Sequence, residues 1–148
     1  MEKNNVQKQE LLRVEGLKKY FDTPKGTLHA VDDVDFVINK GETLGVVGES
    51  GCGKSTMGRA ILRLHEPTAG KIFFEGKDIM NCSRSQMKAL RSDMQMIFQD
   101  PYASLNPRMT VKEAIIETML VQGIFKKNQT EAMNKRVREI MDLVGLSQ

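Results

Sequence analysis

The alternation of apolar and polar positions predicts strands at the start of the chain. Residues 11–17 follow a polar tail and form a run that is typical of a strand. Residues 30–38 alternate apolar side chains with aspartates, although imperfectly, and this pattern predicts a second strand. Between the two, Pro24 and Gly26 indicate a loop over residues 20–27.

Three more runs are predicted to be strands. Residues 43–47 and 94–98 are apolar enough to be buried, whereas residues 71–74 form a short β-prone segment. Turns that contain glycine, at residues 39–41 and 75–77, bound these runs. The first half of the chain is therefore expected to contribute a sheet.

Apolar residues at a spacing of three or four predict the helices, and a loop is expected at residues 102–108, which contain Pro107. We interpret the methionines within the helical segments as core or interface packing, because methionine commonly fills gaps. The predicted helices are residues 57–64, residues 85–91 with Ser83 or Ser85 as the cap, residues 111–122, and a segment from 133 to 144 that stops at Gly145.

Length and charge narrow the class of protein. A chain of 148 residues is long enough for one domain, which we place at residues 11–148 after a polar tail at residues 1–10. The net charge of +3 comes from interleaved acids and bases, so we expect no nucleic-acid partner.

Two cysteines make no disulfide framework and indicate a reducing, cytosolic setting. The tail does not read as a secretory signal, and no apolar run approaches the ~20 residues that span a bilayer.

The strongest chemical signal is a complete phosphate-binding loop. The spacing Gly48-x-x-x-x-Gly53-Lys54-Ser55 follows a predicted strand and precedes a predicted helix, which is the context that this motif requires. Glycines allow backbone N–H groups to wrap a triphosphate, and the helix directs its positive end to the same place. The candidate phosphate-binding residues are Gly48, Glu49, Ser50, Gly51, Cys52, Gly53, Lys54, Ser55 and Thr56.

Individual side chains of this loop have distinct expected roles. Lys54 supplies a mobile positive charge for the β- and γ-phosphates, and the Ser55 hydroxyl is suited to bind Mg²⁺, a hard ion that prefers oxygen. Thr56 is expected to cap the helix or to contact the α-phosphate. A dinucleotide-binding turn is the rival interpretation, but Thr56 stands where that motif needs its third glycine.

A second motif selects among P-loop proteins. Residues 96–110, with the sequence MIFQDPYASLNPRMT, strongly resemble the Q-loop region of the ATPase subunits of ATP-binding-cassette (ABC) importers. The form of both motifs looks like the oligopeptide, dipeptide and nickel branch, and more like the second of the two ATPases that these importers usually pair. The resemblance covers residues 11 to 145 approximately. It implies an α/β fold, namely a P-loop NTPase fold of the ABC-ATPase type, truncated before the signature motif.

The resemblance also implies roles for residues outside the P-loop. Gln99 matches the Q-loop glutamine, which in the family approaches Mg²⁺ and the attacking water, and its carboxamide can both accept and donate hydrogen bonds. Phe21 matches the aromatic residue that stacks on adenine, with Tyr20 as the alternative. His29 and His65 match no catalytic position of the family, and we expect solvated or structural roles for both.

The implied cofactors are ATP and Mg²⁺, with Lys54 and Gln99 as catalytic residues and with Ser55 and Gln99 as metal ligands. The implied partners are permease subunits in the membrane, a second ATPase subunit in a homo- or heterodimer, and, indirectly, an external solute-binding protein. The implied location is the cytoplasmic face of the cell membrane, as a peripheral subunit.

Several family motifs are missing from the 148 residues. There is no LSGGQ-like signature, no apolar strand ending in Asp-Glu, and no later loop aspartate or switch histidine. Asp100 is next to Gln99, but nothing in the sequence directs it at an attacking water. We therefore expect a truncated product or a partial gene model that folds marginally alone, with two strands, residues 43–47 and 94–98, deprived of their neighbours.

Two functional hypotheses follow. The first is an ATPase subunit that energises peptide uptake through ATP binding and hydrolysis, and the second is a nucleotide-binding remnant without turnover. Because the signature and the catalytic glutamate are absent, the sequence argues against activity of this chain alone. A small kinase or GTPase is a weaker alternative, since the Q-loop motif argues against it and no Asn-Lys-x-Asp motif occurs.

Overall fold

The computed structural model describes residues 9–100 and 105–146. By their internal contacts they divide into two compact units, Met1–Met96 and Ile97–Gln148, and each is considered by itself. The elements of the first unit, in chain order, are β1 (Glu10–Thr23), β2 (Gly26–Asn39), α1 (Lys54–Ile61), β3 (Ala69–Phe74), β4 (Lys77–Asp78) and α2 (Arg84–Leu90).

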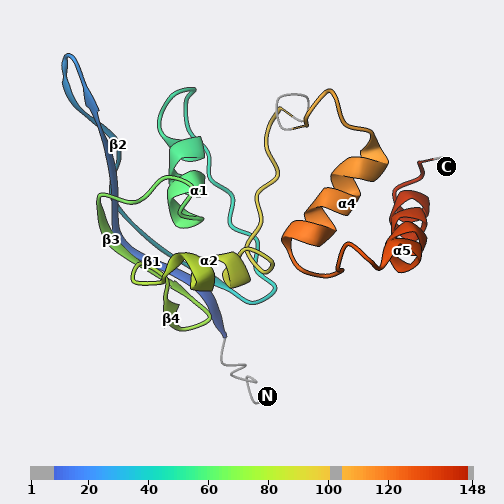
Figure 1. The fold of residues 1–148 in the computed structure, drawn as a ribbon. Helices are drawn as coiled ribbons and strands as arrows, with labels where there is room; N and C mark the ends of the chain where they lie inside the picture. Colours follow the sequence, from blue (N-terminus) through green and yellow to red (C-terminus); the bar gives the residue numbers. More distant parts are fainter. Residues whose placement is uncertain (1–8, 101–104, 147–148) are drawn as a thin grey trace, which may run out of the picture. The chain divides into compact units, whose positions relative to one another are not determined.

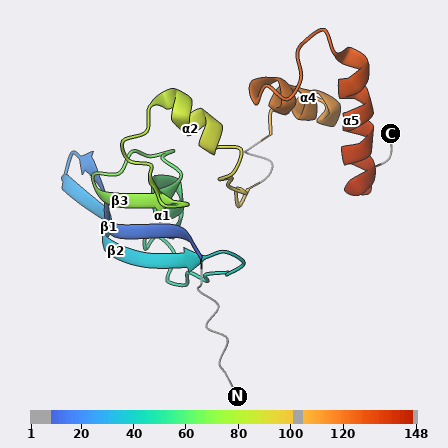
Figure 2. The ribbon, with the colours of Figure 1, turned by 90° about the horizontal axis from the view of Figure 1, so that it is seen from below.

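The strands of the first unit form one antiparallel sheet in the order β2-β1-β3-β4 (Figure 1). The strand β1 is central: Val14 lies opposite Phe36 of β2 on one side and opposite Ile72 of β3 on the other. Figure 2 shows β2, β1 and β3 side by side in this sheet. Because β1 has neighbours on both sides, its backbone N–H and C=O groups can be satisfied within the sheet.

The core of this unit lies where α1 packs against β1 and β2. Leu17 and Ile72 of the sheet and Ala60 of α1 are fully buried, which removes their apolar surface from water and supplies the main favourable term in folding. The other buried members of the cluster are Val14, Val31, Ile79, Cys82 and Met87.

The predicted loop at residues 20–27 is wrong, because this segment is part of a β-hairpin. The strand β1 continues to Thr23, and only residues 24 and 25 form the turn before β2 begins at Gly26. The Thr23 hydroxyl donates to the carbonyl of Gly26 at 2.6 Å, and Gly26 has a φ of 116°. The Pro and Gly signals are thus confined to the tight turn.

Two predicted strands do not form in the part of the chain that the structure describes. Residues 43–47 and 94–98 have no regular secondary structure there and pair with no strand of the sheet. The side chains of Val47 and Ile97 are 93% and 99% exposed. An apolar run becomes a strand only when another strand satisfies its backbone groups, and local pattern alone does not provide that partner.

The remaining predictions for this unit are confirmed. The helix expected at residues 57–64 is α1, shifted toward its N-terminus, and the strand expected at residues 71–74 is β3. The helix α2 has Ser83 as its cap, where the Ser83 hydroxyl accepts from the N–H of Gln86 and the Gln86 side chain accepts from the N–H of Ser83. This reciprocal pair is a capping box and explains where the helix starts.

The second unit contains α4 (Val111–Val121) and α5 (Thr130–Leu143), which contact each other. Their predicted positions are confirmed, and Gly145 follows α5 with a φ of 71°. Thr110 and Glu113 form a capping box at the start of α4. Within residues 105–108, no helix or strand occurs, while residues 101–104 of the predicted loop lie outside the described residues. Among the helices that the structure describes, none has the length and apolar character to cross a membrane.

Candidate nucleotide-binding site

The glycine-rich loop packs closely against strand β2 at Gly53. This residue has a φ of 94°, and a Cβ atom placed on it would lie 2.0 Å from the carbonyl oxygen of Ala30 in β2. Gly51 also has a positive φ, 82°, but its missing Cβ would meet nothing within 4 Å. The requirement for glycine is therefore conformational at Gly51 and both conformational and steric at Gly53.

The Lys54 side chain folds back across the loop that precedes it. Its ammonium nitrogen donates to the carbonyl oxygens of Gly48 at 2.8 Å and of Glu49 at 2.6 Å, and lies 3.4 Å from the Cys52 sulfur. The loop thus surrounds the positive charge with its own oxygens. A phosphate group that reached the ammonium would compete with these two carbonyls for its three hydrogens.

The start of α1 leaves backbone donors available beside that charge. Gly53 is the N-cap, and among the described residues no side chain caps the helix. The first turn carries no acidic residue, and the N–H of Met57 is bonded to the carbonyl of Gly53. The N–H groups of the residues between them have no partner within a helix, so they are suited to bind an anion. The capping role considered for Thr56 is wrong, whereas its contact with a phosphate stays a prediction.

A groove of about 440 Å³ lies between β2 and the loop. It brings together residues of β2 and of residues 46–57, which are far apart in the sequence. Both groups contribute apolar side chains, and Lys54 is also part of the lining. Its lining residues are His29, Ala30, Val31, Asp32, Val34, Val46, Val47, Cys52, Gly53, Lys54 and Met57.

The two aromatic candidates for base stacking occupy different surroundings. The ring of Phe21 meets that of His65 edge to face, with centroids 5.8 Å apart, and the Lys19 ammonium lies 4.7 Å from its centroid. The ring of Tyr20 stacks on His29, with centroids 3.9 Å apart and planes 13° from parallel. His29 lines the groove and Phe21 does not, but which aromatic residue would contact adenine stays a prediction.

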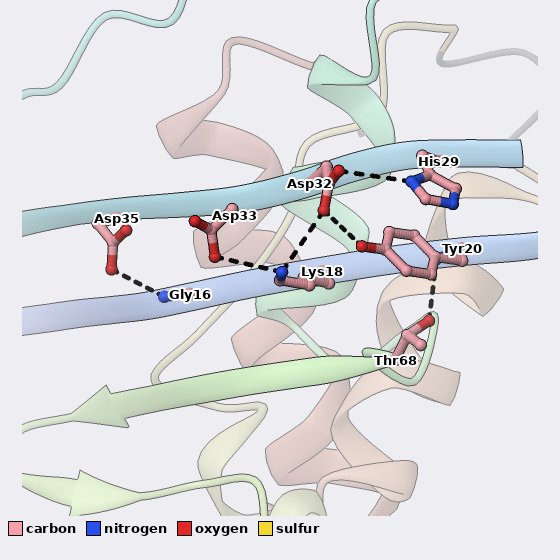
Figure 3. A network of polar contacts seen from close by, with 8 residues as sticks. All are labelled: Gly16, Lys18, Tyr20, His29, Asp32, Asp33, Asp35 and Thr68. Carbon is pink, nitrogen blue, oxygen red and sulfur yellow. Dashed lines mark hydrogen bonds and ion pairs between the residues drawn. The ribbon is translucent and has the colours of Figure 1, made fainter.

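Asp32 connects the groove to a polar network on the hairpin (Figure 3). Its carboxylate accepts a hydrogen bond from the Tyr20 hydroxyl and lies 3.4 Å from His29 Nδ1 and 3.8 Å from the Lys18 ammonium. The hydrogen bond from Tyr20 is the main cause that holds the pKa of Asp32 below its usual value, and the same bond raises the pKa of Tyr20. Lys18 also pairs with Asp33 at 3.4 Å, and this contact raises the pKa of Lys18.

Sequence reasoning missed this network because it treated residues 20–27 as a loop. A hairpin with a two-residue turn places Tyr20 opposite His29, so the pairing follows once the register is known. The prediction for His29 and His65 is a solvated or structural role; in the structure their rings contact those of Tyr20 and Phe21, respectively.

The remaining site predictions are untested. Gln99 is exposed and belongs to the second unit, so its approach to the P-loop stays a prediction. Residues 101–104 of the second motif lie outside the described residues. Ser55 is exposed at the start of α1. Within the described parts of the chain, no three His, Cys, Asp or Glu residues form a cluster that could hold a metal. Both cysteines are free, with Cys52 exposed and Cys82 buried.

A loop with the spacing Gly48-x-x-x-x-Gly53-Lys54-Ser55 that leads directly into helix α1 is the loop and helix of a P-loop protein, although residues 43–47 before it form no strand. The family model described as "ABC transporter" matches residues 31–148. The chain therefore belongs to the ABC transporter family.

Curated relatives carry names that refer to peptide transport. The chain is 51% identical over 140 residues to the oligopeptide transport ATP-binding protein OppF of Bacillus subtilis (strain 168), a match that covers 94% of this chain and 45% of OppF. It is 44% identical over 144 residues to the oligopeptide transport ATP-binding protein AppF of the same organism, covering 92% of this chain and 43% of AppF. The chain thus spans less than half the length of these relatives.

Solved structures support the fold. A dimeric ATP-binding cassette, MJ0796 bound to ADP and Pi, superposes with a TM-score of 0.77 at 22% identity, over 93% of this chain and 59% of that one. CbiO1 from Clostridium perfringens, part of the ABC transporter complex CbiONQ, gives a TM-score of 0.68 at 27% identity, over 94% of this chain and 52% of that one. The predicted fold, a P-loop fold of the ABC-ATPase type, is confirmed.

Proposed function

We propose that this chain is the nucleotide-binding part of an ATPase subunit that energises peptide uptake by an ABC transporter through ATP binding and hydrolysis. The observation that carries the proposal is the position of the Lys54 ammonium, held over the loop within 2.8 Å of the carbonyl oxygens of Gly48 and Glu49, beside the uncapped start of α1. The names of OppF and AppF support oligopeptides as the transported class.

The loop would act by positioning and by charge. Backbone N–H groups at the start of α1 and the Lys54 ammonium converge on one small volume, which suits the β- and γ-phosphates of ATP. Gly51 and Gly53 hold the loop in a conformation that brings backbone rather than side chains to this volume. The backbone donors are in place before the ligand arrives, whereas the Lys54 ammonium would exchange hydrogen bonds to the carbonyls of Gly48 and Glu49 for hydrogen bonds to phosphate.

Mg²⁺ fits the oxygen donors that the chain offers. The Ser55 hydroxyl and the Gln99 carboxamide would be its protein ligands, since both offer the oxygen atoms that this ion prefers. When bound, Mg²⁺ neutralises charge on the phosphates. In this proposal, Gln99 orients the attacking water through its carboxamide, and Lys54 stabilises negative charge as it develops.

The subunit would work in an assembly. We place it as a peripheral subunit at the cytoplasmic face of the membrane, bound to permease subunits and paired with a second ATPase subunit. An external solute-binding protein would deliver the peptide to the permease. The dimeric state named for the MJ0796 cassette supports the pairing of ATPase subunits.

One observation favours nucleotide binding without turnover by these residues alone. Asp32 is the acidic side chain that lines the groove, and it already accepts from Tyr20 and pairs with Lys18. These contacts keep its pKa low, which makes it a poor general base. Asp32 therefore does not supply the groove with a proton acceptor for water.

Nucleotide titrations of the purified chain test the proposal. We expect MgATP to bind in calorimetry and Lys54→Ala to weaken binding by at least about tenfold, because a charge-assisted contact is lost. Lys25→Ala is the matched control, since Lys25 is an exposed lysine in the hairpin turn and lies outside the groove. Equal affinity in the unaltered chain and the Lys54 variant, or no MgATP binding at all, would overturn the proposed function.

A further inference from the structure

A second pocket of the first unit has no part in the proposed nucleotide site. Its volume is about 370 Å³, and it lies between the end of the α1 segment, the residues after β4, and α2. It shares no lining residue with the groove that contains Lys54. The residues around it are Arg63, Glu66, Cys82, Arg84, Met87 and Arg91.

One wall of this pocket is rigid. Arg63 donates through Nη1 to the carbonyl oxygens of Ile79 at 2.8 Å and of Cys82 at 3.0 Å. Its Nε and Nη2 atoms donate to the two carboxylate oxygens of Glu66 at 3.0 Å and 3.1 Å. Four of the five N–H groups of this guanidinium are therefore used, and the charge of Glu66 is compensated by Arg63.

The opposite wall carries two further arginines. Arg84 and Arg91 stand seven positions apart, at the first residue of α2 and at its C-cap, so they lie on the same side of the helix. Both are exposed to solvent. Within the described residues, neither forms an ion pair or a side-chain hydrogen bond, whereas Arg63 of the same pocket pairs with Glu66. This wall thus presents positive charge that no described acidic side chain compensates.

The floor between these arginines is apolar. Met87, in the middle of α2, is 6% exposed, and Cys82 is 9% exposed. Guanidinium groups present paired donors that match the two oxygens of a carboxylate or a phosphate.

We propose that this pocket is a second anion-binding site, which takes a compact oxyanion group, either a phosphate or a carboxylate, between Arg84 and Arg91. The ligand's oxygens accept from these two guanidinium groups, while Arg63 and Glu66 form the fixed wall behind it. The site is independent of ATP and of the proposed function, because it uses none of the P-loop residues.

Nuclear magnetic resonance of the arginine side chains in the full 148-residue chain tests the proposal. Inorganic phosphate and succinate are titrated separately, with sodium chloride at equal ionic strength as the reference. We expect saturable shifts of the Nε–H signals of Arg84 and Arg91 with one or both anions. The anion with the lower apparent Kd shows whether the site prefers a phosphate or a carboxylate. Arg84→Gln and Arg91→Gln should each raise the apparent Kd about tenfold, the loss of one charge-assisted contact.

Two variants separate this site from other effects of charge. Lys88→Gln removes a positive charge from α2 outside the pocket and should change the apparent Kd less than about twofold, as expected for an exposed charge. Lys54→Ala, which alters the P-loop, should leave the phosphate-dependent shifts of Arg84 and Arg91 unchanged. Shifts that chloride reproduces, that never saturate, or that Lys88→Gln reduces as much as Arg84→Gln would overturn the proposal.

Discussion

Gly53 and Ala30 are 23 positions apart in the sequence, yet a Cβ atom on Gly53 would lie 2.0 Å from the carbonyl oxygen of Ala30. This approach fixes the end of the P-loop against the middle of β2. It therefore links two properties of the chain that are usually measured separately, the stability of the hairpin and the geometry of the anion-binding loop.

The first prediction concerns this approach. Gly53→Ala should lower the free energy of unfolding by ~2–4 kcal/mol, because the new methyl group meets backbone and the positive φ is unfavourable for alanine. The same substitution should also lower the affinity for MgATP. Urea denaturation and calorimetry measure the two effects. Gly51→Ala is the matched control, since its φ is also positive but its Cβ meets nothing within 4 Å, so it should cost only about 1 kcal/mol. Equal costs for the two variants would contradict the steric explanation.

The P-loop illustrates what the sequence can predict and what it cannot. Its glycines, Lys54 and the following helix were all predictable, because the motif encodes local backbone geometry. The contact between Gly53 and Ala30 was not, because it depends on the hairpin that residues 20–27 complete. The strand predicted at residues 43–47 was wrong for the opposite reason. The segment is apolar, but a strand also requires a partner strand, which the apolar pattern does not specify.

The second prediction concerns the hydrogen bond between Tyr20 and Asp32 (Figure 3). The pKa of Asp32 lies below its ordinary value of 3.8, so the bond stabilises the folded chain above about that pH and is lost as pH falls through the lowered pKa. The pKa of Tyr20 lies above 10.0, so the same stabilisation is present below that pH and is lost as pH rises through the raised pKa. Tyr20→Phe should therefore destabilise the chain between these limits and have no effect beyond them.

Urea midpoints measured across the pH range test this window. In an Asp32→Asn background, Tyr20→Phe should no longer produce a pH-dependent difference, because the ionised acceptor is absent. If the unaltered chain and the Tyr20→Phe variant differ by the same amount at all pH values, the hydrogen bond to the ionised Asp32 carboxylate does not account for the difference.

The third prediction uses the two free thiols. Cys52 is exposed in the P-loop, 3.4 Å from the Lys54 ammonium, whereas Cys82 is buried. A disulfide reagent should therefore modify the Cys52 thiol rapidly and the Cys82 thiol slowly, since the reagent must reach the sulfur atom. MgATP should slow the rapid phase, because phosphates in the loop would cover Cys52. Cys52→Ser should remove the rapid phase and Cys82→Ser the slow one. Equal rates for the two thiols would contradict the structure, and a rapid phase insensitive to MgATP would argue against the proposed site.

The last prediction compares two isoleucines with opposite environments. Ile72 in β3 is fully buried against β1, whereas Ile97 is 99% exposed. Ile72→Ala should cost about 2–5 kcal/mol of unfolding free energy, because it leaves a cavity in the core of the first unit. Ile97→Ala removes the same atoms and should change that free energy by less than about 0.5 kcal/mol. Urea denaturation followed by circular dichroism measures both variants. A large loss for Ile97→Ala would mean that the Ile97 side chain is packed in solution, as the apolar pattern of residues 94–98 predicts.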